Sequence, residues 1–272
     1  MKKEYLVCVD SDGCAMDTML IKHKRCFGPC LVREWQLQEW EAEILRRWDQ
    51  INLYSITRGV NRFRGLLIML REIHEKYRAI DGLSEYEAWV EHSDELSEAS
   101  LKKANSSVCA EKALRWSESV NAAIRQLPPL QPFGLVEGAL RYMHHHADIV
   151  IVSGANREAV ISEWERHELM GYVDEVMTQD AGSKSTCIAK MLDSGYSPSR
   201  TLMCGDAPGD ERAARENGVY FYPILVGREE ESWRDLMDIG LPKFLSGDYG
   251  EYGQNRTRLF YQNLGAEGEL TW

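Results

Sequence analysis

Short apolar runs alternate with longer helical patterns along most of the chain. Residues 5–10 form a compact apolar run with β-branched side chains, which is typical of a strand buried on both faces. Beyond residue 134 the pattern predicts helices at 135–146, 157–170, 183–192 and 210–216, alternating with strands at 148–152, 173–178, 201–204 and 219–225. Strands separated by single helices are joined by right-handed crossovers, so the pattern predicts a parallel sheet.

Residues 20–127 have a different pattern, with almost no strand signal and several apolar stripes at helical spacing. The stripes run through residues 35–48, 63–73, 89–96 and 110–124. Ser84 and Glu87 have the spacing of a capping box, which predicts a helix start. Five of the eight tryptophans lie in this segment, which at about 100 residues is too long for a connecting loop. We therefore predict an inserted all-helical domain with its own core.

The two patterns divide the chain into two domains. Residues 1–19 and 128–272 are predicted to form an α/β domain with a parallel sheet, and residues 20–127 form the helical insert. Near the end of the chain, residues 229–237 have a helical pattern. Residues 246–253 are rich in Gly and Tyr, so their pattern favours no particular element.

Composition narrows the range of partners. The formal charge of the 272 residues is −11, so the surface field repels nucleic acid backbones and anionic membranes. No apolar run approaches the roughly 20 residues that cross a bilayer, and the stretch at 5–9 is too short for a signal peptide. Seven cysteines without Cys-x-x-Cys spacing argue against a disulfide framework and a structural zinc site. We expect a cytoplasmic protein that binds neither nucleic acid nor membrane.

Polar residues follow several predicted strands, at the sheet edge where α/β proteins bind ligands. These segments are 10–13 (Asp-Ser-Asp-Gly), 153–156 (Ser-Gly-Ala-Asn) and 205–210 (Gly-Asp-Ala-Pro-Gly-Asp), and Lys184 opens the helix after another strand. Together they place carboxylates, a hydroxyl and an ammonium group at one rim. Phosphoryl transfer uses such groups, because a carboxylate can act as nucleophile while cations and hydrogen-bond donors stabilise the phosphoryl oxygens.

The residue types suggest individual roles. Asp10 is the candidate nucleophile that would carry an acyl phosphate. Asp12 points to the same side of an extended chain two residues later, so it is the candidate general acid and base. Mg²⁺ prefers oxygen ligands, and we assign Asp10, Asp12 and Asp206 to it, with Asp210 in support. The residues expected to hold the transferring phosphoryl group are Ser153, Gly154 and Lys184.

These segments, in this order, resemble the four motifs of the haloacid dehalogenase-like hydrolase superfamily. The motifs match residues 7–13, Ser153, Lys184 and residues 205–210. Asp17-Thr18, soon after the first motif, is similar to members that carry a helical cap inserted at that point. The resemblance implies an α/β fold with a Rossmann-like parallel sheet core and an inserted all-helical cap.

Some residues keep a second interpretation. Lys184 lacks the following proline that is common in capped members, so Lys190 is the alternative lysine of the third motif. Ser153 could instead cap the following helix. In the cap, Arg58 and Arg62 are candidates for substrate contacts, because guanidinium groups suit phosphate and carboxylate. A basic helix start that faces solvent has the same pattern.

The resemblance implies a Mg²⁺-dependent phosphatase that hydrolyses a small phosphomonoester, a phosphorylated metabolite, through an aspartyl-phosphate intermediate. A phosphomutase of the β-phosphoglucomutase type would use the same two aspartates and is the first alternative. Dehalogenase and phosphonate-hydrolase relatives lack the second aspartate, which Asp12 supplies here. A third possibility is a non-catalytic protein that uses the tryptophan-rich cap to bind a partner.

Overall fold

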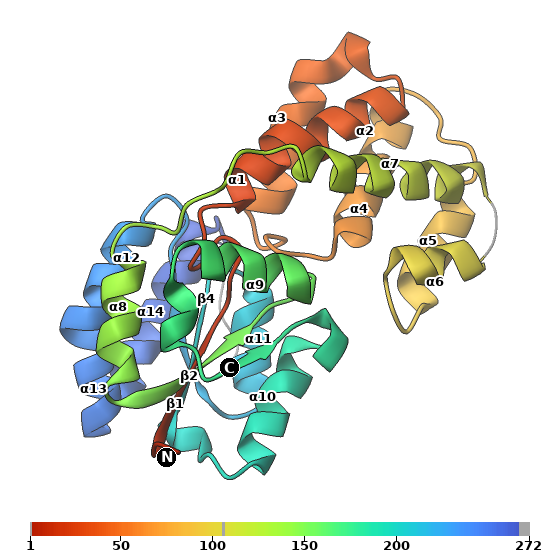
Figure 1. Cartoon of the computed structure of the whole chain (residues 1–272). Coiled ribbons are helices and arrows are strands. Elements are labelled where there is room, and N and C mark those ends of the chain that lie inside the picture. Colours follow the sequence, from red (N-terminus) through yellow and green to blue (C-terminus); the bar gives the residue numbers. More distant parts are fainter. Residues whose placement is uncertain (1, 105–106, 267–272) are drawn as a thin grey trace. The chain divides into compact units, whose positions relative to one another are not determined.

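The chain folds into two compact units (Figure 1). The computed structural model describes residues 2–104 and 107–266. One unit, the α/β unit, takes in the described residues of Met1–Met19 and Pro129–Trp272. The other, the helical unit, takes in those of Leu20–Pro128.

In the described part of the α/β unit, five parallel strands form one sheet in the order β3-β2-β1-β4-β5. The strands are β1 (Tyr5–Val9), β2 (Ala147–Val152), β3 (Glu175–Met177), β4 (Thr201–Gly205) and β5 (Tyr220–Pro223). Strand β1 is central, and its last residue, Val9, is in register with Ile151 of β2 and Cys204 of β4. The segments that follow these three strands therefore emerge at the same edge of the sheet.

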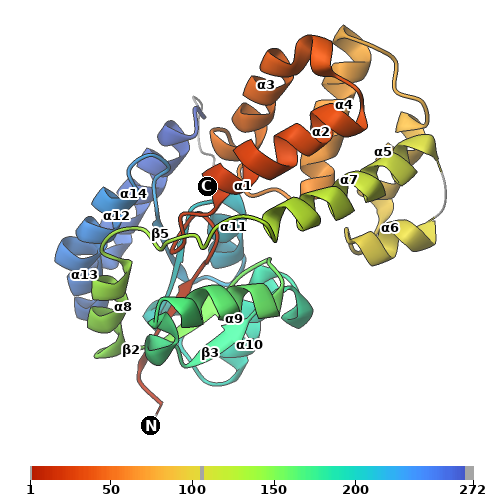
Figure 2. The same cartoon turned by 45° about the horizontal axis from the view of Figure 1, so that its top comes forward.

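Helices cover both faces of this sheet (Figures 1 and 2). One face packs against α8 (Val136–His144), α9 (Arg157–Arg166), α12 (Glu229–Asp235) and α13 (Leu241–Ser246). The other packs against α10 (Lys184–Asp193) and α11 (Pro208–Glu216). Because successive strand residues point to opposite faces, the strands contribute apolar side chains to both cores. This arrangement is the predicted α/β fold with a parallel sheet.

The long helix α14 (Tyr249–Asn263) packs beside the edge strand β5. Tyr249 joins the core on one face of the sheet, and its hydroxyl donates to the Phe221 carbonyl over 2.7 Å. Phe260 joins the core on the other face. The helix thereby covers the edge strand β5, whose backbone N–H and C=O groups on that side have no neighbouring strand in the described part of the chain.

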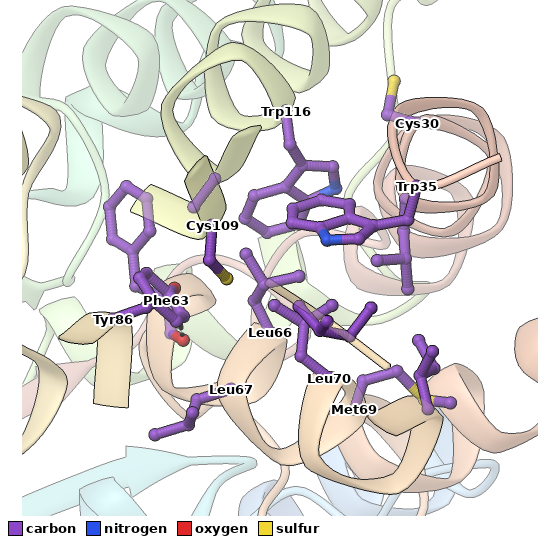
Figure 3. Close-up of a cluster of buried hydrophobic side chains, with 14 of the residues drawn as sticks. Cys30, Trp35, Phe63, Leu66, Leu67, Met69, Leu70, Tyr86, Cys109 and Trp116 are labelled. Atoms are coloured by element: carbon purple, nitrogen blue, oxygen red, sulfur yellow. Dashed lines mark hydrogen bonds between the residues drawn. The ribbon is translucent and has the colours of Figure 1, made fainter. Parts of the chain in front are cut away.

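The helical unit contains helices and connecting segments and has no strand among its described residues. Its helices are α1 (Met19–Lys22), α2 (Gly28–Glu34), α3 (Glu41–Leu53), α4 (Arg62–Lys76), α5 (Leu83–His92), α6 (Glu98–Ala104) and α7 (Val108–Ile124), with a π-helical turn at His23–Phe27. Their apolar faces meet in a core that includes Trp35, Phe63, Leu66 and Trp116 (Figure 3). These side chains form a hydrophobic core within the helical unit.

Three local predictions in this unit are wrong. The helix predicted through residues 89–96 ends at His92, so Leu96 lies outside α5. The stripe at 35–48 is not one helix, because α2 ends at Glu34 and Gln36 adopts a left-handed backbone with φ of 54° before α3 begins. The capping box at Ser84 is absent, since Gly82, with φ of 75°, occupies the N-cap position and Ser84 already lies within the first turn. Its hydroxyl donates to Glu85 instead.

Further along the chain, the helix predicted at 157–170 ends at Arg166, because Glu168 adopts a left-handed backbone with φ of 57°. A 3₁₀ turn at Leu169–Tyr172 follows. Across residues 2–104 and 107–266, no helix combines the length and the apolar character needed to span a membrane.

Candidate active site

Asp10 lies where the central strand β1 ends. Its backbone N–H donates to the Cys204 carbonyl of β4 over 3.0 Å, so the sheet pairing extends to this residue. The side chain is buried, and its Oδ1 accepts from the Ser11 backbone N–H at 2.8 Å. The carboxylate is therefore held in one orientation by the chain that follows it.

Two further aspartates reach the same place from the segment after β4, Asp206 in the loop and Asp210 in the first turn of α11. Among the described residues, Asp10, Asp206 and Asp210 form a buried group in which one carboxylate oxygen from each residue lies within 4.8 Å of the other two. Asp210 is also fixed at the start of α11, where its Oδ2 accepts from the Ala207 backbone N–H at 3.0 Å. Three convergent carboxylates form an oxygen ligand set of the kind that suits a hard divalent cation such as Mg²⁺.

Gly205 allows the Asp210 side chain to lie close to the backbone at the end of β4. The sequence analysis assigned no separate role to this glycine. A Cβ atom at Gly205 would lie 2.3 Å from Cγ of Asp210, so only glycine fits there. The signal was present in the sequence as the first residue of the Gly-Asp-x-x-x-Asp segment.

Lys184 is the lysine that lies beside the carboxylates. Its Nζ is 2.8 Å from Oδ2 of Asp10 and 2.5 Å from Oδ1 of Asp210. It stands at the first position of α10, whose N-cap is Ser183. Lys190 instead donates to the Ala181 carbonyl over 2.7 Å from an exposed position. The structure therefore favours Lys184 over Lys190 as the lysine of this site.

Burial and charge act against each other at this cluster. Burial raises the pKa of Asp10, and Asp210 and Asp206 raise it further, whereas the nearby Lys184 ammonium lowers it. Burial lowers the pKa of Lys184, but Asp10 and Asp210 outweigh it and hold that pKa above its usual range. Three carboxyl groups thus share one ammonium group, and a divalent cation bound among them would favour their ionised forms.

Asp12 lies outside the group of three carboxylates. It is partly buried, and its Oδ1 accepts a short hydrogen bond from the Thr18 hydroxyl. The loop between them doubles back at Gly13, whose φ of 80° is left-handed. Of the four aspartates predicted to bind or support the metal, the structure thus clusters Asp10, Asp206 and Asp210, and places the Asp12 side chain against Thr18.

Ser153 follows β2 and is buried, and its backbone N–H donates to the Met177 carbonyl of β3 over 3.0 Å. Its Oγ accepts from the Ala155 N–H at 3.2 Å. The N-cap of α9 is Asn156, whose side chain accepts from the first turn, so Ser153 is not the helix cap. Gly154 is exposed, and among the described residues no atom lies within 4 Å of a Cβ built there.

Arg58 and Arg62 belong to the helical unit. Arg58 is buried and donates through Nη1 to the Leu53 carbonyl at 2.9 Å. Arg62 donates to Oδ1 of Asn121 at 2.7 Å and to the Ser117 hydroxyl at 3.1 Å. Both guanidinium groups thus make hydrogen bonds within their own unit.

The sequence of the chain matches a family model. Residues 66–224, more than half of the chain, match the haloacid dehalogenase-like hydrolase family. This range includes Ser153, Lys184, Asp206 and Asp210 and begins after Asp10. No curated protein sequence matches the chain.

Solved structures with a similar fold include three with a TM-score of 0.50. A haloacid dehalogenase-like family hydrolase from Streptococcus pneumoniae is 15% identical, and the match covers 80% of this chain and 83% of that one. A provisionally assigned phosphoglycolate phosphatase from Lactobacillus delbrueckii subsp. bulgaricus is 14% identical, with 81% and 85% covered. A provisionally assigned phosphatase from Clostridium difficile is 13% identical, with 87% and 100% covered. At these identities the similarity concerns the fold.

Proposed function

Because the chain belongs to the haloacid dehalogenase-like hydrolase family, we propose that it is a Mg²⁺-dependent phosphatase that hydrolyses a small phosphomonoester through an aspartyl-phosphate intermediate. The observation that carries this proposal is the buried cluster of Asp10, Asp206 and Asp210 with the Lys184 ammonium between two of them. The names of two similar structures, which mention phosphatases, are consistent with it.

In the first step, a carboxylate oxygen of Asp10 attacks the phosphorus atom of the substrate. The bond between phosphorus and the ester oxygen breaks, and Asp12 donates a proton to the departing alkoxide. In the second step, Asp12 accepts a proton from a water molecule as that water attacks phosphorus. Inorganic phosphate leaves, and the Asp10 carboxylate is regenerated.

Three further residues of the α/β unit are proposed to stabilise the negative charge of the transferring phosphoryl group. Lys184 stands next to Asp10 and would pair with the phosphoryl oxygens. The Ser153 hydroxyl and the Gly154 backbone N–H are the proposed hydrogen-bond donors to the same oxygens. The open space around Gly154 leaves room for a ligand to approach its backbone.

Asp10, Asp206 and Asp210 are the residues that would hold Mg²⁺, which when bound supplies positive charge beside the nucleophile and the phosphoryl oxygens. Asp12 was assigned to the metal as well as to proton transfer. Asp12 is not among the three clustered carboxylates, and its hydrogen bond with Thr18 supports the proton-transfer role.

The helical unit, residues 20–127, is the proposed cap of this enzyme. A cap excludes bulk water from the reaction and selects the substrate. Arg58 and Arg62 are its proposed substrate contacts, and their hydrogen bonds within the cap would hold the guanidinium groups in place. The substrate would be a small phosphorylated metabolite of the cytoplasm.

The test is the release of inorganic phosphate from an aryl phosphate, with Mg²⁺ present or removed by a chelator. Wild-type protein should release phosphate only with the metal, and Asp10→Asn should abolish the release. Asp148→Asn is the matched control. Asp148 is also a buried carboxylate, but it lies near the start of β2, at the other end of the sheet from Asp10. Metal-independent activity, or full activity of Asp10→Asn, would contradict the proposal, whereas isomerisation driven by a bisphosphate would indicate a phosphomutase.

A further inference from the structure

The loop that carries both catalytic aspartates is compact and turns sharply. We call residues 10–18 the aspartate loop. The Ser11 carbonyl accepts backbone N–H groups from Cys14, Ala15 and Met16 at 3.3, 3.0 and 2.8 Å. One residue, lying between Asp10 and Asp12, therefore anchors the whole turn, and displacement of Ser11 would move both carboxylates.

Trp164 of α9 contacts this anchor directly. Its indole Nε1–H donates to the Ser11 hydroxyl oxygen over 2.9 Å, across 153 residues of sequence. Both residues are fully buried. An indole can only donate, so this bond fixes where the Ser11 side chain lies. In a buried location the loss of a partner leaves a polar group unsatisfied, which makes the contact costly to break.

Trp233 of α12 contacts the other side of the turn. Its Nε1–H donates to the Cys14 carbonyl over 3.1 Å, and Trp233 is also fully buried. Helix α12 comes close to the chain entering α8 as well, since a Cβ at Gly134 would lie 2.4 Å from Oε1 of Glu230. Phe133, next to that glycine, donates its N–H to the Ala15 carbonyl over 3.0 Å. Helix α12 lies beyond residue 224, where the family match ends.

We propose that Trp164 and Trp233 are positioning residues whose indole N–H groups hold the aspartate loop in the geometry that the reaction requires. A nucleophile that is misplaced by about 1 Å can lose roughly 100-fold in rate. Two donors from two helices restrain the loop at Ser11 and Cys14, on either side of Asp12. The catalytic consequence rests on the proposed phosphatase function, while the restraint of the loop does not.

The experiment compares Trp164→Phe and Trp233→Phe with a matched control. Phenylalanine keeps an aromatic ring but removes the indole donor. Trp116→Phe is the control, because Trp116 is fully buried in the helical unit and donates to the Phe27 carbonyl over 3.2 Å. Amide hydrogen exchange of peptides covering residues 10–18 is measured in the full-length proteins, together with kcat and KM for the best aryl phosphate.

In both loop variants, exchange across residues 10–18 should accelerate by roughly three- to tenfold, as expected for loss of one hydrogen bond. In Trp116→Phe it should stay at the wild-type rate. With an active enzyme, kcat should fall about tenfold or more while KM stays within about twofold. Unchanged exchange in the loop, or a rise in KM alone, would overturn the positioning role. If the wild type releases no phosphate, the function fails and the exchange result still decides the inference.

A second variant separates the Trp164 contact from loss of packing. Ser11→Ala removes the acceptor while Trp164 stays in place. If the hydrogen bond is what restrains the loop, Ser11→Ala should accelerate exchange of residues 12–18, and adding Trp164→Phe should cause little further change. Additive effects of the two substitutions would contradict the proposed coupling.

Discussion

At the scale of single residues, the candidate active site depends on close contacts of Lys184 with carboxylates and of Asp210 with the backbone. Lys184 lies within 2.8 Å of carboxylate oxygens from two different segments, and Asp210 approaches the backbone of Gly205 more closely than any side chain there would allow. The motif residues could be predicted from their types and order. Their distances could not, because they depend on how β1, β4 and α10 come together.

Lys184→Met should lower kcat/KM by at least about 100-fold, since it removes the ammonium group that would stabilise the phosphoryl oxygens. Lys190→Met is the control and should stay within about twofold, because Lys190 is exposed and bonds only to the Ala181 carbonyl among the contacts described. Steady-state kinetics with an aryl phosphate measure both. Equal losses in the two variants would show that Lys184 has no special role.

Gly205→Ala should displace the Asp210 carboxylate and weaken Mg²⁺ binding, because the new methyl group would lie 2.3 Å from Cγ of Asp210. Overpacking of this kind also costs about 1–3 kcal/mol of unfolding free energy. Gly209→Ala is the control, because no described atom lies within 4 Å of its Cβ position in α11. Calorimetric titration with Mg²⁺ compares them, and wild-type affinity in Gly205→Ala would refute the steric argument.

At the scale of elements, the strands and most helices could be predicted from the periodicity of apolar residues. The points where a helix ends, and helices that contain several glycines, could not. Helix α14 includes Gly250 and Gly253, which disfavour helix formation locally. A Cβ at Gly253 would lie 2.5 Å from the Tyr249 ring, so the glycine lets this tyrosine pack along its own helix. Tertiary packing thus overrides the local signal. The contacts of Trp164 and Trp233 span 153 and 219 residues and have no sequence signature.

Phe260→Ala should destabilise the α/β unit by about 3–5 kcal/mol, because Phe260 is a buried ring that attaches α14 to the sheet. Leu259→Ala, at the neighbouring position, where the residue is 43% exposed, should change the free energy of unfolding by less than about 0.5 kcal/mol. Urea unfolding of the full-length proteins gives both values. Similar stability of the two variants would mean that α14 contributes little to the core.

At the scale of the whole molecule, two units with separate cores share one chain. The chain passes from one to the other after Met19 and returns at Pro129. An insert of this length with its own apolar core could be predicted from the helical stripes and the tryptophans. Which residues of the helical unit would contact a substrate could not be predicted, because that depends on tertiary contacts that have no signature in the sequence.

Mg²⁺ should raise the stability of the α/β unit selectively, since a ligand that binds only the folded site stabilises it by mass action. At about 100 times the dissociation constant the gain is roughly 2.7 kcal/mol. Hydrogen exchange should show this protection around β1 and β4 and leave α4 and α7 unchanged. Asp206→Asn should lose the effect, and equal protection of both units would contradict a site built only from the α/β unit.

The proposed mechanism requires that Asp10 becomes phosphorylated during turnover. Protein is quenched in acid after mixing with an aryl phosphate and Mg²⁺, and intact mass spectrometry counts the phosphoryl groups on it. Borohydride reduction of a second sample, which releases the phosphate and converts the acylated aspartate to homoserine, followed by peptide mapping, locates the residue. The intact mass should increase by one phosphoryl group per chain, homoserine should be found at position 10 after reduction, and both signals should be missing in Asp10→Asn. A phosphoryl group on another residue, or turnover without any covalent intermediate in rapid-quench samples, would contradict it.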